Sequence, residues 1–224
     1  MSHAALLVLA DGRFPAGGHA HSGGVEAAVA SHGVHDAASL EAFCRGRLHT
    51  AGLTAAGLAA AAATGYDPMA LDEAADARTP VPALRQVARK LGRQMLRAAR
   101  AAWPCPELDQ IAHSLPKGAH QPVVLGVTAR AAGLTPSDAA QCAAYESIGG
   151  PATAAVRLLS LNPFDATALL ARLAGELDDV AHAAADAAAR IDAEGVGVLP
   201  AASSPLLDIT GEQHAAWSQR LFAS

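Results

Sequence analysis

Histidines, glycines and a serine crowd into one short run near the N-terminus, from Phe14 to Glu26. His19 and His21 stand two residues apart in it and could ligate a metal ion. The four glycines of the run could let the backbone approach a phosphate closely. Ser22, which follows the second histidine, could act as a nucleophile. The run could therefore belong to a metal site, a phosphate-binding loop or a nucleophilic active site, and each of these needs further residues around it.

Each of these chemistries lacks its partners in the sequence. A closed metal site takes three or four ligands, and neither a nearby cysteine nor an HExxH pattern completes the histidine pair. The run has no GxxxxGK[ST] pattern and no long strand before it, so it does not match a phosphate-binding loop. Ser22 lacks the GxSxG frame of a hydrolase nucleophile. We expect no enzyme, no catalytic residue, no cofactor and no tight metal site.

The composition favours helices as the elements that position this run. Of 224 residues 51% are hydrophobic, much of that fraction is alanine, and only 4% are aromatic. Alanine is the strongest helix former and a weak strand former, so we expect an all-α fold. An alanine-rich core buries little area per residue, which makes an oligomer or a permanent partner plausible.

Charge and cysteine usage exclude several classes of protein. The net charge of −5 gives no reason to expect nucleic-acid binding. The three cysteines are odd in number and far apart, which fits a reducing compartment. The longest apolar stretch is too short to span a membrane, and no signal peptide is evident. We expect a soluble, cytoplasmic protein.

Cap residues followed by proline mark many helix starts, as in Asp67-Pro68, Thr135-Pro136 and Asn162-Pro163. Together with the apolar spacing they predict about nine helices, near 24–32, 37–64, 68–76, 81–103, 107–115, 121–132, 136–160, 164–174 and 176–194. We expect one helical domain over 1–195. A Pro- and Ser-containing linker over 196–205 then leads to a flexible C-terminal segment, 206–224.

Two helices are polarised in charge. Arginines recur every three or four residues on one face of the 81–103 helix, at Arg85, Arg89, Arg93, Arg97 and Arg100. The stretch from Asp165 to Glu194 is instead acidic. Both patterns fit solvated helix faces, and either could also dock an oppositely charged protein.

Four segments of the chain form a set of motifs in a fixed order. The first is the opening run, with Pro15, Gly17, Gly18, Ser22, Gly24 and Glu26. The last is the C-terminus, with His214, Trp217, Arg220, Leu221 and Phe222 followed by Ala223-Ser224. Between them lie residues 89–96 and 120–127. In this order, the four segments resemble motifs of the urease accessory protein UreF family.

The sequence departs from the family pattern at several positions. His19 stands where the family usually has an aromatic residue, Val25 replaces a leucine, and Ala223 replaces an arginine. The segment around 158–163 lacks the Pro-Leu-Gly-Gln form that is frequent in the family.

The resemblance implies a non-catalytic, all-helical chaperone that dimerises. In this family the protein binds UreD, also called UreH, and with it recruits the GTPase UreG and aids nickel insertion into apo-urease. By this resemblance the matched residues of the two end segments bind partners, and deleting 206–224 should abolish UreD binding while the helical body stays folded. Two alternatives remain: a GTPase-activating protein that uses an arginine of the 85–100 stripe, and a metallochaperone that holds nickel through the N-terminal histidines.

Overall fold

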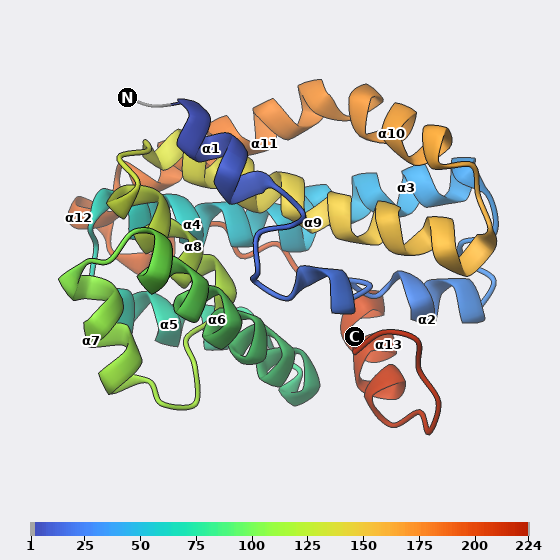
Figure 1. Cartoon of the computed structure of the whole chain (residues 1–224), viewed down its shortest axis with the longest axis horizontal. Coiled ribbons are helices and arrows are strands. Elements are labelled where there is room, and N and C mark those ends of the chain that lie inside the picture. Colours follow the sequence, from blue (N-terminus) through green and yellow to red (C-terminus); the bar gives the residue numbers. More distant parts are fainter. Residues whose placement is uncertain (1–2, 224) are drawn as a thin grey trace.

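The computed structural model describes residues 3–223, and the regular elements among them are all helices, with no strand (Figure 1). Residues 1, 2 and 224, which belong to the expected domain and C-terminal segment, lie outside the described part. The first half of the chain forms α1 (His3–Ala10), α2 (Val25–Ala30), α3 (Ala37–Arg47), α4 (Leu53–Thr64), α5 (Pro68–Ala77), α6 (Pro82–Ala102) and α7 (Pro106–Ser114). The second half forms α8 (Gln121–Ala131), α9 (Pro136–Leu159), α10 (Pro163–Arg172), α11 (Ala174–Ala188), α12 (Ile191–Glu194) and α13 (Pro205–Ala215). Short 3-10 turns cover Gly18–Ala20 and Val196–Val198. This confirms the all-α prediction.

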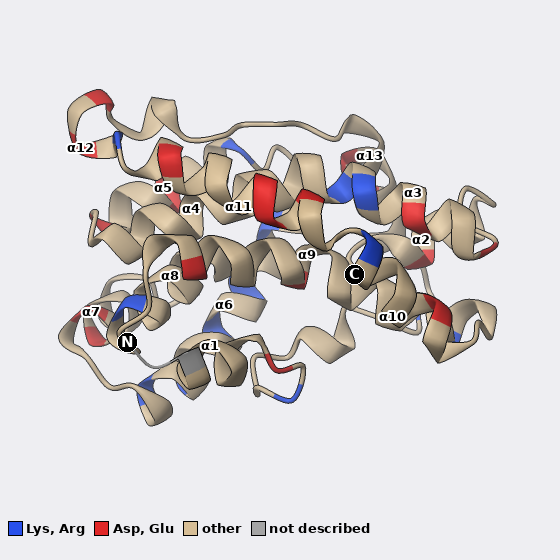
Figure 2. Cartoon of the chain, turned by 90° about the horizontal axis from the view of Figure 1, so that it is seen from above, with Lys and Arg blue, Asp and Glu red and all other residues tan. Residues whose placement is uncertain are grey.

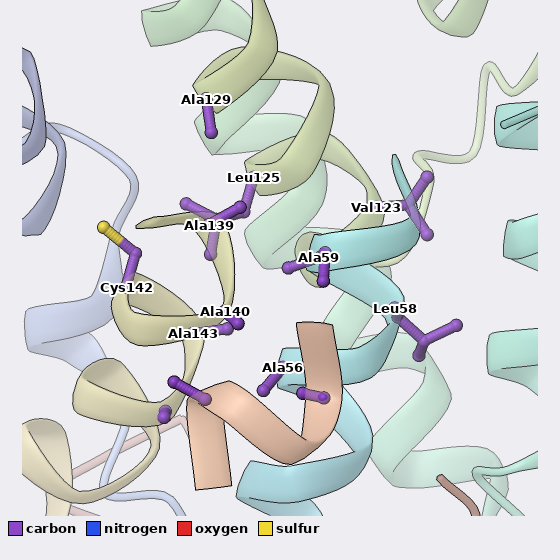
Figure 3. Packing of buried hydrophobic residues seen from close by; sticks show 14 of the residues in the cluster. Ala56, Leu58, Ala59, Val123, Leu125, Ala129, Ala139, Ala140, Cys142 and Ala143 are labelled. Carbon is purple, nitrogen blue, oxygen red and sulfur yellow. The ribbon is translucent and has the colours of Figure 1, made fainter. Parts of the chain in front are cut away.

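The core lies where α4, α8, α9 and α11 pack on one another, with α9 crossing the middle of the molecule (Figure 1). Alanines supply much of the contact surface, among them Ala56, Ala59, Ala140 and Ala143 (Figure 3). At Gly126 of α8 an added Cβ would lie 2.1 Å from the Ala59 carbonyl oxygen. The small side chains therefore let the helix backbones approach closely, and that close approach compensates for the small area that each alanine buries.

Several predicted helix starts are confirmed by their hydrogen bonds. The Asp67 carboxylate accepts from the amides of Met69 and Ala70, at 3.1 and 3.2 Å. Thr135 and Asp138 form a reciprocal capping box at the start of α9. The Asn162 side chain caps α10. These signals could be read from sequence because a cap and its target amide lie within three residues of each other.

The predicted helix over 37–64 is interrupted by a π-helical turn, Leu48–Gly52, that joins α3 to α4. That turn brings Gly52 against α9, where an added Cβ would lie 2.6 Å from the Ser147 hydroxyl. Pro151 within α9 cannot donate a hydrogen bond to the Ser147 carbonyl, and Nε of Arg47 donates to it instead, at 2.8 Å. An arginine of α3 thus preserves the continuity of α9.

The structure differs from the prediction at both ends of the chain. Residues 3–10 form a helix that the apolar pattern alone did not reveal, and 205–215 form α13. The predicted 176–194 helix is divided into α11 and α12, so the helices exceed the expected number of about nine. The C-terminal segment is folded onto α2 and α6, whereas we expected a flexible segment (Figure 1).

Over residues 3–223, none of the helices combines the length and the apolar character that crossing a membrane requires.

Candidate functional site

The two chain ends meet at the carboxylate of Glu26, in the first turn of α2. This buried carboxylate accepts a hydrogen bond from Nε2 of His214, at 2.8 Å. It also accepts from the backbone amides of Leu221, at 2.8 Å, and Phe222, at 3.1 Å. One side chain of the N-terminal run therefore holds three groups of the C-terminal segment.

The electrostatics favour an ionised Glu26. Burial opposes its ionisation, but the hydrogen bonds from Leu221, His214 and Phe222 outweigh that effect and keep the pKa of Glu26 below its usual value. Hydrogen bonds to a buried carboxylate are among the stronger polar contacts in proteins, because the charge has no water to compensate for their loss.

Further contacts hold the last residues in place. The amide of Ala223 donates to the carbonyl of Ala20, at 2.8 Å. Phe222 is buried, and the guanidinium of Arg157 lies 5.0 Å from the centre of its ring. The ring centres of His214 and Trp217 are 4.7 Å apart. The segment that follows α13 is thus held by a hydrogen bond to the N-terminal loop and by a cation–π contact to α9.

Three of the four glycines of the loop, Gly17, Gly23 and Gly24, are required by its shape. Gly17 and Gly24 have φ values of +82° and +90°, in the left-handed region that favours glycine. At Gly17 an added Cβ would overlap the Gln94 side chain of α6, because it would lie 1.5 Å from the amide oxygen. At Gly23 it would lie 2.9 Å from Pro151 of α9. The loop is therefore fitted closely between α6 and α9.

The two histidines of the run lie in different environments. His19 is exposed, whereas His21 is buried. Burial, with smaller effects from Lys90 and His19, lowers the pKa of His21 to about 4, so its ring is neutral at neutral pH. In the part of the chain that the structure describes, no three His, Cys, Asp or Glu side chains lie close enough together to hold a metal ion.

The expected contact residues fall into two sets. Ser22, Glu26, His214 and Phe222 are buried where the ends meet. Pro15, Gly18, Arg220 and Leu221 face outward, and Gly17, Gly24 and Trp217 are intermediate in exposure. The structure thus brings together residues from both ends of the chain, but only some of them are open to a partner.

Two apolar residues of α13 that the sequence motifs do not include, Leu206 and Ile209, are 72% and 56% exposed. With Leu221, which is 71% exposed, they make the C-terminal segment unusually apolar on its outer side. Sequence analysis missed the pairing of Glu26 with His214. An acid in one end motif and a histidine in the other were the available signal, but 188 positions separate them.

Most of the arginine stripe on α6 is used within the chain. Arg89 pairs with Asp72 and Asp76, at 2.9 and 2.7 Å, and Arg100 pairs with Asp109 at 2.7 Å. Arg85 donates to the carbonyls of Thr79 and Pro80. Arg97 is exposed, and no carboxylate among residues 3–223 lies within ion-pair distance of it.

The acidic stretch also has internal partners. Glu176 of α11 pairs with Arg45, and its other oxygen lies 2.9 Å from Nε2 of His49. Asp178 accepts from the Gln141 side chain, at 3.2 Å. Part of this charge therefore joins α11 to α3, α9 and the turn before α4.

Comparison with known proteins supports the resemblance of the end motifs. The UreF family model matches residues 34–174. A urease accessory protein UreF of Mycobacterium sp. (strain JLS) is 43% identical over 98% of this chain and 97% of its own length. The protein of the same name from Mycolicibacterium vanbaalenii is also 43% identical, over 100% of this chain and 99% of its own length. That of Mycobacterium tuberculosis (strain ATCC 25618 / H37Rv) is 38% identical over 100% of this chain and 99% of its own. Because the family model matches more than half of the chain and these relatives align with nearly all of it, the chain belongs to the UreF family of urease accessory proteins.

Proposed function

We propose that this chain is a non-catalytic scaffold of urease maturation in the cytoplasm. As a homodimer it binds UreD (UreH), recruits the GTPase UreG and aids the insertion of nickel into the urease apoprotein. Membership of a family named for a urease accessory role supports the process. The arrangement of the chain ends supports the scaffold role.

The single observation that carries the proposal is the apolar outer side of the C-terminal segment. Leu206, Ile209 and Leu221 are more than half exposed, although the buried contacts of Glu26 hold their segment in a defined place. Burying each of these side chains against a partner would contribute about 1.5–3 kcal/mol, less the cost of ordering. A preorganised segment keeps that cost low.

The residues around this apolar surface have separate roles in the proposal. Arg220 is exposed and can form charge-assisted hydrogen bonds with a partner carboxylate. Pro15 and Gly18 face outward from the adjacent loop and extend the same contact. Glu26, His214 and Phe222 position the segment rather than touch the partner.

A pull-down with UreD and UreG tests this proposal. We expect the triple variant Leu206→Ser, Ile209→Ser, Leu221→Ser to lose UreD while its helical content stays unchanged by circular dichroism. The matched control is Phe164→Ser in α10, because Phe164 is 80% exposed but lies on another helix. Undiminished capture of UreD by the triple variant would overturn the role of the C-terminal segment. The chain lacking 206–224 should also lose UreD, although it would uncover Glu26 as well.

One observation favours a second candidate, a GTPase-activating protein with an arginine finger. Of the five stripe arginines, Arg97 is the one that is exposed and, among the described residues, makes no hydrogen bond or ion pair. An arginine finger must reach a phosphate in another protein, which a free guanidinium can do. If the native chain stimulates GTP turnover by UreG, and the Arg97→Ala variant still binds UreG but no longer stimulates it, this candidate is supported.

A further inference from the structure

A second surface stands out on α6, where several basic side chains carry no internal ion pair among the described residues. We define the basic face as Lys90, Arg93 and Arg97 of α6 together with Lys117 in the connection to α8, all of them exposed. Arg93 donates to the backbone carbonyl of Lys117, which places that connection directly against the helix. Lys90 and Lys117 are the two lysines of the chain.

The charge of the basic face is not neutralised within the chain. Helix α6 contains no acidic residue (Figure 2), and among residues 3–223 no carboxylate lies within 4.0 Å of the four cationic groups. The neighbouring Arg89 and Arg100, by contrast, both have carboxylate partners. A cluster of unpaired positive charges on a protein whose net charge is −5 favours an anionic partner at this place.

A groove of about 430 Å³ lies beside these cations. It is lined by Arg89, Ser114, Leu115, Pro116, Lys117 and Gly118. Gly118 has a φ of +93°, and an added Cβ there would lie 2.4 Å from the Arg89 carbonyl oxygen, so the connection is seated tightly on α6. The groove thus joins apolar walls at Leu115 and Pro116 to Lys117 of the basic face, and Arg89, which is paired with Asp72 and Asp76, completes its lining.

We propose that the basic face docks an acidic segment of a partner protein, with an apolar side chain in the groove and carboxylates on Lys90, Arg93 and Lys117. Mixed apolar and cationic walls suit a peptide better than a nucleic acid, because a phosphate backbone gains little from the apolar part. The inference rests on the proposed function only in taking the partner to be a protein. It is independent of the apolar residues of the C-terminal segment.

A fluorescent peptide of alternating Glu and Leu is the probe for a binding experiment on the full chain. We expect its affinity to fall steeply between 50 and 200 mM salt, as charge-driven contacts do. We expect the double variant Lys90→Glu, Lys117→Glu to bind it at least about tenfold more weakly. The matched control is Arg13→Glu, Arg190→Glu, which changes the net charge equally at exposed sites elsewhere, where each arginine pairs with an acid.

Carbodiimide cross-linking gives a second, positional readout. This reagent joins a carboxylate directly to an amine, and the chain offers it the side-chain amines of Lys90 and Lys117 alone, besides the N-terminal amine. We expect peptide cross-links at Lys90 and Lys117 by mass spectrometry, and a marked loss of these links when unlabelled peptide competes.

Three results would overturn the inference. The first is that the double variant and its control bind the peptide equally weakly, which would show that only net charge matters. The second is tighter binding of a DNA duplex than of the peptide. The third is salt-sensitive self-association in analytical ultracentrifugation that Lys90→Glu, Lys117→Glu abolishes, which would make the occupant a second copy of the chain. Leu206→Ser, Ile209→Ser, Leu221→Ser should leave peptide binding unchanged, so failure of the proposed function and failure of this inference are distinguishable.

Discussion

The alanine-rich core and the junction of the chain ends are held together in opposite ways. In the core, α4, α8, α9 and α11 are held together mainly by many small apolar contacts. At the junction, one carboxylate accepts three hydrogen bonds from a segment that lies nearly 200 residues away in sequence. The core should therefore fail through changes in volume, and the junction through the loss of one charge.

The largest effect should follow from a single methyl group in the core. We expect Gly126→Ala to lower the free energy of unfolding by about 3 kcal/mol, because its Cβ would lie 2.1 Å from the backbone oxygen of Ala59. Gly175→Ala in α11 is the control, since nothing lies within 4 Å of its added Cβ. The control should stabilise the protein by about 0.5–1 kcal/mol. Equal denaturant midpoints for the two variants would refute the role of close helix approach.

The next effect should be local rather than global. We expect Glu26→Gln to lower the free energy of local opening of the C-terminal segment by about 2 kcal/mol. The side-chain amide of the variant lacks the negative charge that the three donors face. Hydrogen exchange of the amides of 214–223 should quicken by more than tenfold while that of α4 and α9 stays the same. Glu73→Gln, at an exposed position of α5, should change neither. A uniform rise in exchange across the chain would contradict a local junction.

Acidification should weaken the loop side of the junction before the core. The folded-state pKa of His21 is about 4 and its ordinary value is 6.5, so the unfolded chain binds the proton first. The stability that the neutral ring contributes is complete above pH 6.5 and is lost as the pH falls toward 4. As the pH falls from 6.5 to 4, the thermal midpoint of the native chain should therefore fall more than the thermal midpoint of the His21→Asn variant. Parallel curves for the two proteins would show that His21 is not the titrating group.

The smallest effect should have the opposite pH dependence. Burial raises the pKa of Glu146 in α9 to about 7, while the hydrogen bond from Gln121 partly opposes this. Because the folded state holds that proton more tightly than the unfolded chain, stability is lost as the pH rises from about 4.5 through 7. Glu146→Gln should raise the thermal midpoint at pH 8 by about 2 °C, since ~1 kcal/mol corresponds to roughly 2–4 °C at this chain length. At pH 5 it should change little.

The prediction succeeded where the physics is local. The caps Asp67, Thr135 and Asn162 act within one turn, so sequence spacing alone located the starts of α5, α9 and α10. It failed where the cause is distant. The π-helical turn at Leu48–Gly52 packs against Ser147, about a hundred positions away, and the local sequence pattern does not predict it.

The sequence by itself determined the helical class, most of the helix starts and the family, because composition, caps and end motifs can be read along the chain. Only the tertiary structure decided which residues of those motifs are buried and which are exposed. Glu26 and His214 are 188 positions apart, and only the folding of the helices brings them to 2.8 Å. The same folding turned the C-terminal segment, expected to be flexible, into a docked segment with an apolar outer side. A buried carboxylate must find donors wherever the fold supplies them, and no sequence pattern specifies where those donors will be.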